Sequence, residues 1–368
     1  MRTAPVLAAA LSAAVASAQP VFDESAAIDR MGDGSSAAWM EDGVLHAIVR
    51  VEAESVLLLA AVQEELELLS EPDLWGGAFE IERADEAVMS CAFGARTEDG
   101  LERVHETPPI RGALARPPVA SADPVRGTIE THMLGADRMG ADREVFVYMP
   151  PDVRADEIRQ VLYLADGQSV TSQVPQIEAL VVSGAIPPTL VVGVSSASGV
   201  AFGDPSQDTR AIEYLSGFSR FAEGADPERF DKHWLFFTRD VPDLIEEMVG
   251  VTIEPGDRIV AGTSNGGAFA ATVAALAPER FGASIVLSSG WLLVADNFEP
   301  LTGRADAHRA FFSAGVHEPR FLEQTTAASR AAEEAGYTVF LDERVGGHDP
   351  LIWREQLAAG LLWLGSPD

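Results

Sequence analysis

Residues 258–267 read RIVAGTSNGG, a short apolar run that leads into a serine flanked by glycines. The apolar run predicts a buried strand, and the alanine-rich residues after Ser264 predict a helix. Gly262 and Gly266 would let the chain turn tightly, because a side chain at either position would keep neighbouring segments apart. Ser264 would then stand as a nucleophile beside the N–H groups of a helix N-terminus. The alternative is a glycine-rich helix start that Ser264 merely caps.

The chain around this stretch alternates strands and helices from residue 128 to the end. Apolar runs such as Val161 to Leu164 fit strands that are buried on both faces of a parallel sheet. The expected strands cover residues 144–149, 161–164, 190–194, 258–261, 283–287, 309–313 and 337–342, and the expected helices cover residues 236–249, 265–277, 320–335 and 350–365. This alternation predicts an α/β fold, with a mostly parallel sheet between two layers of helices.

A nucleophilic serine needs a base, and one histidine is in the right place to supply it. Residues 346–349 read GGHD and lie between the last expected strand and the last expected helix. The two glycines would let a loop carry the imidazole of His348 over Ser264. For the histidines at 46, 105, 132, 233 and 308 we expect surface or packing roles.

The histidine in turn needs a carboxylate that holds its tautomer and stabilises the imidazolium. In folds with this kind of serine turn the chain order is serine, acid, histidine. Glu318, in the loop after the strand at 309–313, is the expected acid, and Asp342 is the second choice. Asp349 adjoins His348 and is poorly placed to reach the correct ring nitrogen. Each carboxylate could instead be a solvated loop residue.

Two backbone N–H groups should stabilise an oxyanion at the same place. One would belong to Asn265, directly after the nucleophile, and the other to Gln168, in the loop after the strand at 161–164. The alternative is that Asp166 and Gly167 form an ordinary turn.

Composition narrows the possible partners. The 368 residues carry 26 Lys and Arg against 57 Asp and Glu, a net charge of −31, which excludes nucleic acid as the main partner. No segment after the first 20 residues reaches about 18 continuous apolar residues, so no membrane span is expected. The single cysteine, Cys91, excludes an internal disulfide and is expected to be buried. The sequence has no His or Cys cluster with metal-ligand spacing, so we expect no metal and no organic cofactor.

The N-terminus has the layout of a secretory signal peptide. A short basic start at Met1 and Arg2 is followed by an apolar stretch to Val15 and by the small residues Ala16, Ser17 and Ala18. We therefore expect export to the periplasm or the outside of the cell. The alternative is an ordinary buried N-terminal helix.

The remaining chain divides by composition. The expected segments are a signal peptide (1–18), a flexible lead-in (19–42), a small β-rich, sandwich-like domain (43–105), a proline-rich linker (106–127) and a catalytic domain (128–368). Residues 64–69 could be strand or helix.

Five motifs together resemble the putative-esterase family of α/β-hydrolases, which includes enterochelin esterases, S-formylglutathione hydrolases, feruloyl esterases and mycolyl transferases. The motifs are VLYLADG at 161–167, RAIEY at 210–214, GTSNGG at 262–267, GVHEP at 315–319 and GGHDPLIWR at 346–354. The resemblance implies a triad of Ser264, Glu318 and His348, with oxyanion N–H groups at Asn265 and Gln168. Arg210 falls where relatives carry an arginine beside the cleft; its alternative role is an ion pair with Glu213.

The implied activity is hydrolysis of a small-molecule ester through an acyl-enzyme, on siderophore-like or acylated-carbohydrate esters. The alternatives are acyl transfer on the same fold and a binding protein without turnover. The segment 196–235 would cover the cleft and set specificity, and the alternative is that it is only a solvated lid. The sequence does not indicate an oligomeric state.

Overall fold

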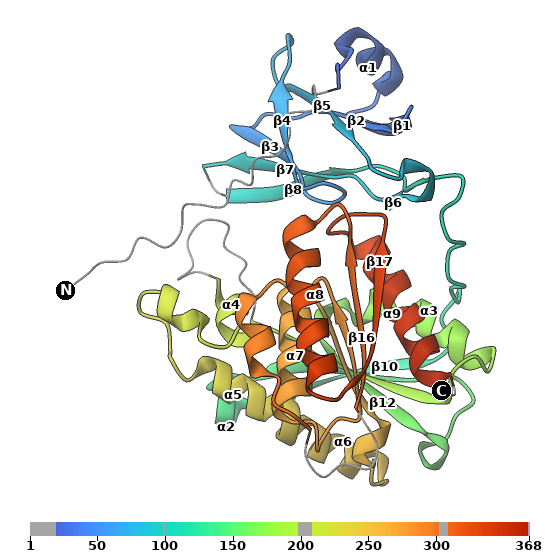
Figure 1. The fold of residues 1–368 in the computed structure, drawn as a ribbon, viewed down its shortest axis with the longest axis vertical. Coiled ribbons are helices and arrows are strands. Elements are labelled where there is room, and N and C mark those ends of the chain that lie inside the picture. The colour runs from blue at the N-terminus through green and yellow to red at the C-terminus, as the bar shows by residue number, and fades with distance from the viewer. Residues whose placement is uncertain (1–19, 99, 198–207, 302–307, 367–368) are drawn as a thin grey trace.

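The structure, a computed structural model, describes residues 20–98, 100–197, 208–301 and 308–366. An antiparallel N-terminal sheet lies over one end of a larger α/β unit, and an extended segment runs down the side to connect them (Figure 1). The predicted signal peptide, residues 1–18, falls outside the described ranges. No helix within those ranges is both long and apolar enough to cross a bilayer.

An eight-stranded sheet forms the centre of the α/β unit, in the order β10-β11-β13-β12-β14-β15-β16-β17. The first two pairings are antiparallel and the remaining five are parallel. The strands are β10 (Thr128–Leu134), β11 (Arg143–Met149), β12 (Gln160–Ala165), β13 (Thr189–Val194), β14 (Arg258–Thr263), β15 (Ala283–Leu287), β16 (Arg309–Gly315) and β17 (Thr338–Arg344). The α/β fold predicted from the alternating pattern is confirmed.

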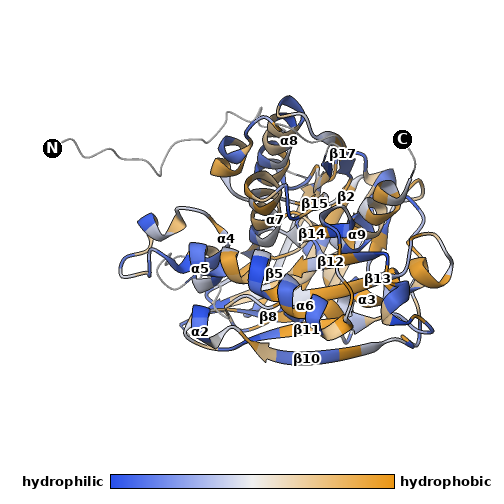
Figure 2. Ribbon diagram, turned by 90° about the horizontal axis from the view of Figure 1, so that it is seen from below, coloured by the Kyte–Doolittle hydropathy of each residue, from blue (hydrophilic) through white to orange (hydrophobic). Residues whose placement is uncertain are grey.

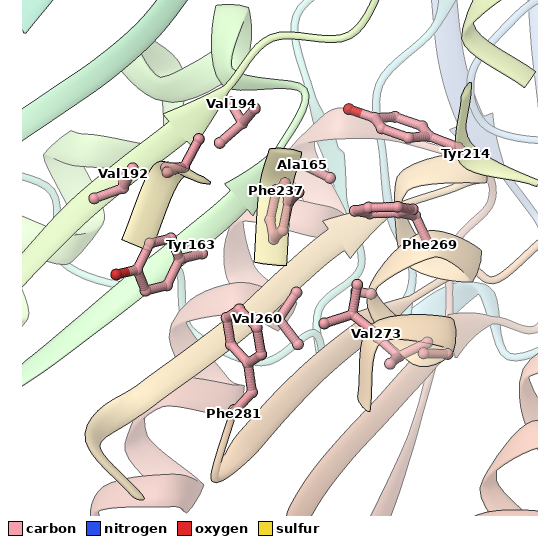
Figure 3. Close-up of a cluster of buried hydrophobic side chains, with 14 of the residues drawn as sticks. Tyr163, Ala165, Val192, Val194, Tyr214, Phe237, Val260, Phe269, Val273 and Phe281 are labelled. Carbon is pink, nitrogen blue, oxygen red and sulfur yellow. The ribbon is translucent and has the colours of Figure 1, made fainter. Parts of the chain in front are cut away.

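Helices cover both faces of this sheet, because each central strand is apolar on both sides. On β12, Tyr163 points to a face packed by α7 and by aromatic residues such as Phe237 and Phe281 (Figure 3), whereas Leu162 points to the face packed by α3 and α9. The helices are α2 (Ala136–Met139), α3 (Val170–Val182), α4 (Thr209–Tyr214), α5 (Arg229–Leu235), α6 (Val241–Val249), α7 (Asn265–Leu276), α8 (Pro319–Glu334) and α9 (Pro350–Gly365). Hydrophobic residues gather on the inner strands, while β10 at the sheet edge mixes hydrophilic and hydrophobic stretches (Figure 2).

The N-terminal sheet has seven antiparallel strands in the order β1-β2-β5-β4-β3-β7-β8. They are β1 (Ser36–Glu41), β2 (Val44–Arg50), β3 (Ser55–Leu58), β4 (Glu65–Leu68), β5 (Leu74–Glu80), β7 (Ala92–Thr97) and β8 (Gly100–Glu106), and a separate short pair joins β6 (Val88–Met89) to β9 (Ile110–Arg111). Leu45 of β2 and Phe93 of β7 share one buried cluster although three strands separate β2 from β7, so the sheet must curve around that cluster. The β-rich character predicted for this part is confirmed, as is the burial of Cys91.

The predicted flexible lead-in, residues 19–42, was wrong for most of its length. Residues 24–31 form helix α1 (Glu24–Met31), whose first turn is capped by Asp23 through the N–H of Ala26 at 3.0 Å. Residues 36–41 form β1, paired along its length with β2. Stacking of Trp39 on His46, with ring centroids 5.0 Å apart, adds to this pairing. Small polar residues suggested mobility, but tertiary pairing decides the structure here. Residues 64–69, for which helix and strand were both open, contain β4.

One buried carboxylate on α4 is hydrogen-bonded to three other segments of the chain. Glu213 on α4 is fully buried and accepts hydrogen bonds from Arg143 Nη2 at 2.6 Å and Arg229 Nε at 2.7 Å. The backbone N–H of Ala197 donates to its second oxygen at 2.6 Å. One side chain on α4 therefore connects β11, the end of β13 and α5.

We predict that Glu213→Gln lowers the free energy of unfolding by about 3 to 5 kcal/mol, because it leaves two poorly solvated guanidinium groups without their counter-charge. Urea unfolding measures the change. The control is Asp156→Ala, which removes an exposed ion pair with Arg154 and should cost less than about 1 kcal/mol. Equal losses in the two variants would contradict this role of Glu213.

Candidate active site

Ser264 occupies a strained turn between β14 and α7. Its backbone has φ 57° and ψ −124°, a conformation that side chains other than glycine rarely adopt, and its N–H donates to Leu287 O at 2.9 Å. A Cβ atom on Gly262 would lie 2.1 Å from Gly266 O, so only glycine allows the two arms of the turn to meet. The predicted strand–turn–helix arrangement is present, and the turn places the Ser264 side chain at the carboxyl end of β14.

A continuous hydrogen-bonded chain connects the serine, the histidine and the predicted acid. Ser264 Oγ lies 3.0 Å from His348 Nε2, and His348 Nδ1 lies 2.6 Å from Glu318 Oε2. Asp342, the second choice for the acid, instead pairs with Arg344 at 2.5 Å and with Arg116. The structure therefore brings Ser264, His348 and Glu318 together and places Asp342 in a separate ion-pair group.

Glu318 is itself held in place by neutral donors. Its side chain is buried, and Oε1 accepts from Ser288 Oγ at 2.6 Å and from the N–H of Gly315 at 2.6 Å. Ser288 Oγ accepts in turn from Trp353 Nε1 at 2.9 Å. These bonds occupy one carboxylate oxygen and leave the other directed at His348. Sequence reasoning missed Ser288, although its position directly after the strand at 283–287 placed it at the same sheet edge.

Two aromatic side chains fix the imidazole ring. Phe321 of α8 stacks on His348 with ring centroids 4.0 Å apart, and Trp353 of α9 meets it edge-on at 4.6 Å. Trp353 thus touches the histidine and supports the acid through Ser288. It lies in the GGHDPLIWR motif, whereas no sequence signal pointed to Phe321.

The two residues expected to provide oxyanion N–H groups lie at the carboxyl ends of neighbouring parallel strands, β12 and β14. Asn265 is the first residue of α7, where helix geometry leaves backbone N–H groups without intrahelical acceptors. Gln168 lies in the 3₁₀ turn Gly167–Ser169 after β12, and its side-chain Nε2 donates to Ser196 Oγ at 3.3 Å. Because β12 and β14 are parallel neighbours, Gln168 and Asn265 lie at the same edge of the sheet.

Arg210 of α4 is held by Asp166 in a two-point ion pair, with Nε–Oδ1 and Nη2–Oδ2 distances of 2.7 Å each. Burial disfavours the charged form of Arg210, yet the Asp166 carboxylate raises its pKa above the ordinary value. The alternative partner, Glu213, binds other arginines. Arg210 thereby fixes the loop that carries Gln168, and its contact with a substrate stays a prediction.

The single cysteine, Cys91, is a poor nucleophile in this structure. Burial raises the pKa of the Cys91 thiol to about 12, so the thiolate is scarce near neutral pH. Within the part of the chain that the structure describes, no group of three or more His, Cys, Asp and Glu side chains is arranged to hold a metal ion.

Comparisons with known proteins agree with this fold. The profile of a family described as "Putative esterase" matches residues 136–364. Iron(III) enterobactin esterase of Escherichia coli K12 is 22% identical over 245 residues, which are 63% of this chain and 56% of that protein. The chain therefore spans little more than half the length of the curated relatives it matches. Crystal structures of the enterobactin esterase FES from Shigella flexneri, in the presence of 2,3-di-hydroxy-N-benzoyl-glycine, and of ferric enterobactin esterase from Salmonella typhimurium both have a TM-score of 0.62 and 16% identity. The first covers 94% of this chain and 99% of its own, the second 90% and 96%.

We predict that Gly262→Ala lowers the free energy of unfolding by about 1 to 3 kcal/mol, because the added Cβ would overlap the Gly266 carbonyl. Urea unfolding measures the loss. Gly365→Ala is the control, since a Cβ there meets no neighbour and the change should be neutral or slightly stabilising. A Gly262→Ala protein as stable as this control would contradict the tight turn.

Proposed function

Because this chain belongs to the putative-esterase family of α/β-hydrolases, we propose that it is a serine carboxylic ester hydrolase. The observation that carries this proposal is the hydrogen-bonded chain from Ser264 through His348 to Glu318, at the carboxyl edge of a parallel sheet. Similarity to the solved esterase structures supports the assignment of the fold. The reaction is inferred from the geometry of these three side chains.

The geometry suggests the following sequence of steps. Glu318 accepts a hydrogen bond from His348 Nδ1–H, which leaves Nε2 free to accept the proton of Ser264 as its oxygen attacks the ester carbonyl. The N–H groups of Asn265 and Gln168 stabilise the resulting oxyanion. His348 then returns the proton to the departing alcohol, and an acyl group remains on Ser264. A water molecule, activated by the same imidazole, releases the acid and restores the serine.

The names of the curated relatives make a siderophore-like ester the first candidate substrate, and an acylated carbohydrate is the second. The net negative charge of the protein opposes the binding of a siderophore-like ester if that ester is anionic. The protein carries a net charge of −31, and three cations after residue 207 are already paired. Their partners are Asp166 for Arg210, Glu213 for Arg229 and Asp226 for Lys232. These three paired cations would therefore add little to the binding of an anionic ester, whereas Arg220 of the same stretch donates to the carbonyl of Gly217 and not to a carboxylate.

Acyl transfer to an alcohol is a second candidate, because both reactions share the acyl-enzyme. Products formed with and without an acceptor alcohol separate the two. A binding protein without turnover would need neither the strained serine nor the buried acid, and both are present.

We also propose that residues 1–18 are a signal peptide and that the mature protein acts in the periplasm or outside the cell. This proposal rests on the sequence of the N-terminus. Mass spectrometry of the exported protein should find Gln19 as its first residue.

We predict that Ser264→Ala lowers kcat at least about 10³-fold, because the activated nucleophile is lost. Initial rates are measured with p-nitrophenyl esters, acylated sugars and ferric catecholate esters. Ser366→Ala, which changes an exposed serine at the end of α9, is the control and should retain full activity. If Ser264→Ala hydrolyses every substrate as fast as the unmodified protein, the proposed mechanism is wrong.

We predict that Glu318→Gln lowers kcat by about 10² to 10⁴-fold, because the amide no longer stabilises the imidazolium or holds the reactive tautomer. Asp342→Asn tests the second-choice acid under the same assay. It disturbs ion pairs with Arg116 and Arg344, but because the carboxylate that contacts His348 is Glu318, kcat should change less than about fivefold. The reverse ranking of these two variants would transfer the role of the acid to Asp342.

A further inference from the structure

The loop that carries His348 is covered on one side by the N-terminal part of the chain, from α1 to β9, which we call the N-terminal domain. We call residues 345–349 the histidine loop. The N–H of Val88 in β6 donates to Val345 O at 2.9 Å, and Val345 belongs to the buried cluster of the N-terminal sheet. A Cβ on Gly347 would lie 1.2 Å from Ala61 O, in the turn after β3, so the two backbones are in direct contact. The residue before His348 can be only glycine while this contact exists.

The residue after His348 is bound even more directly. Asp349 is fully buried, and its carboxylate accepts from Ser90 N at 2.5 Å and from Ser90 Oγ at 2.8 Å. The same carboxylate caps α9 by accepting from the N–H of Leu351 at 2.8 Å. Ser90 lies directly after β6, 259 positions before Asp349 in the sequence. Burial raises the pKa of Asp349 above its ordinary value, and the three donated hydrogen bonds act in the opposite direction.

The opposite side of the histidine loop rests on the loop of the acid. The N–H of Val316 donates to Arg344 O at 2.8 Å, and the N–H of His317 donates to Gly346 O at 2.9 Å. His317 also reaches the N-terminal domain, with Nε2 3.1 Å from Glu82 O. The histidine loop is thus held between the segment that carries Glu318 and the N-terminal domain.

We propose that the N-terminal domain positions the general base: Ser90 and the Ala61 carbonyl hold the histidine loop so that His348 reaches Ser264. The proposal rests on the proposed function of that histidine. Ser90, Asp349 and Ala61 are positioning residues, since none of them touches the reacting atoms. Their contribution follows from preorganisation, because a base that is displaced by about 1 Å can lose much of its catalytic effect.

This role differs from two simpler ones. If the N-terminal domain only bound substrate, weakening the contact would raise KM and leave kcat unchanged. If it only stabilised the fold, weakening the contact would lower Tm and leave kcat unchanged at temperatures well below Tm. A positioning role predicts a fall in kcat in a protein that is folded and saturated with substrate.

The test uses the full chain with p-nitrophenyl esters at 25 °C. Ser90→Ala removes the hydroxyl donor and should lower kcat about tenfold, the size expected for a lost hydrogen bond to a charged group, with KM within about twofold. Asp349→Asn presents an NH₂ group toward a donor and should lower kcat by at least as much. Ser90→Thr keeps the hydroxyl and should restore most of the rate.

Ser70→Ala is the matched control. Like Ser90, Ser70 donates its hydroxyl to a carboxylate. Its partner is Glu24 of the N-terminal domain, and this hydrogen bond is exposed and lies away from the histidine loop. Ser70→Ala should leave kcat and KM unchanged. The downfield proton NMR signal of His348 Nδ1–H gives an independent readout, and it should broaden or shift in Ser90→Ala but not in Ser70→Ala.

A folded Ser90→Ala protein with normal kcat would overturn the proposal, whether Tm falls, KM rises or nothing changes. This outcome is distinct from failure of the proposed function, in which Ser264→Ala itself would remain active. If Asp349→Asn does not fold because it weakens the cap of α9, Ser90→Ala decides alone. In Ser90→Ala the backbone N–H of residue 90 still donates to Asp349, and Asp349 still caps α9.

Discussion

The hydrogen bond between Ser264 Oγ and His348 Nε2 joins residues that lie 84 positions apart, and most of the fold serves to make it. One end depends on a strained turn that only glycine at 262 permits. The other depends on a loop that follows the last strand of the sheet. Parallel strands β14, β15, β16 and β17 bring their carboxyl ends to one edge, so the serine, Ser288, the acid and the histidine arise from consecutive strand ends. Burial of apolar residues on both faces of the sheet holds this edge together.

Much of this arrangement could be predicted from the sequence because its signals are local. Apolar runs fixed the central strands, and a serine between glycines marked the turn at 264. Its place in the loop after the strand at 309–313 then favoured Glu318 over Asp342, which lies on the last strand, and in the structure Glu318 is the carboxylate that contacts His348. Each of these inferences needs only a few neighbouring residues and a rule of topology.

Other features depend on contacts between distant segments, which a single sequence does not reveal. Ser90 and Asp349 look like ordinary polar residues until the fold brings them together. Arg210 pairs with Asp166, not with its neighbour Glu213, because α4 packs against the loop after β12. A flexible lead-in was predicted for residues 19–42 because their composition is small and polar, but residues 24–31 form α1 and pairing with β2 makes residues 36–41 part of a sheet. Such long-range pairings also connect the N-terminal domain to the site.

The central claim is that Ser264 carries the acyl group during turnover, and trapping that intermediate tests it most directly. A p-nitrophenyl ester mixed rapidly with the protein and quenched in acid should leave an acyl group that peptide mass spectrometry assigns to Ser264. An acyl group on a different residue would contradict the account. So would a burst of p-nitrophenol, which shows that an intermediate accumulates, without any acyl group trapped on the protein.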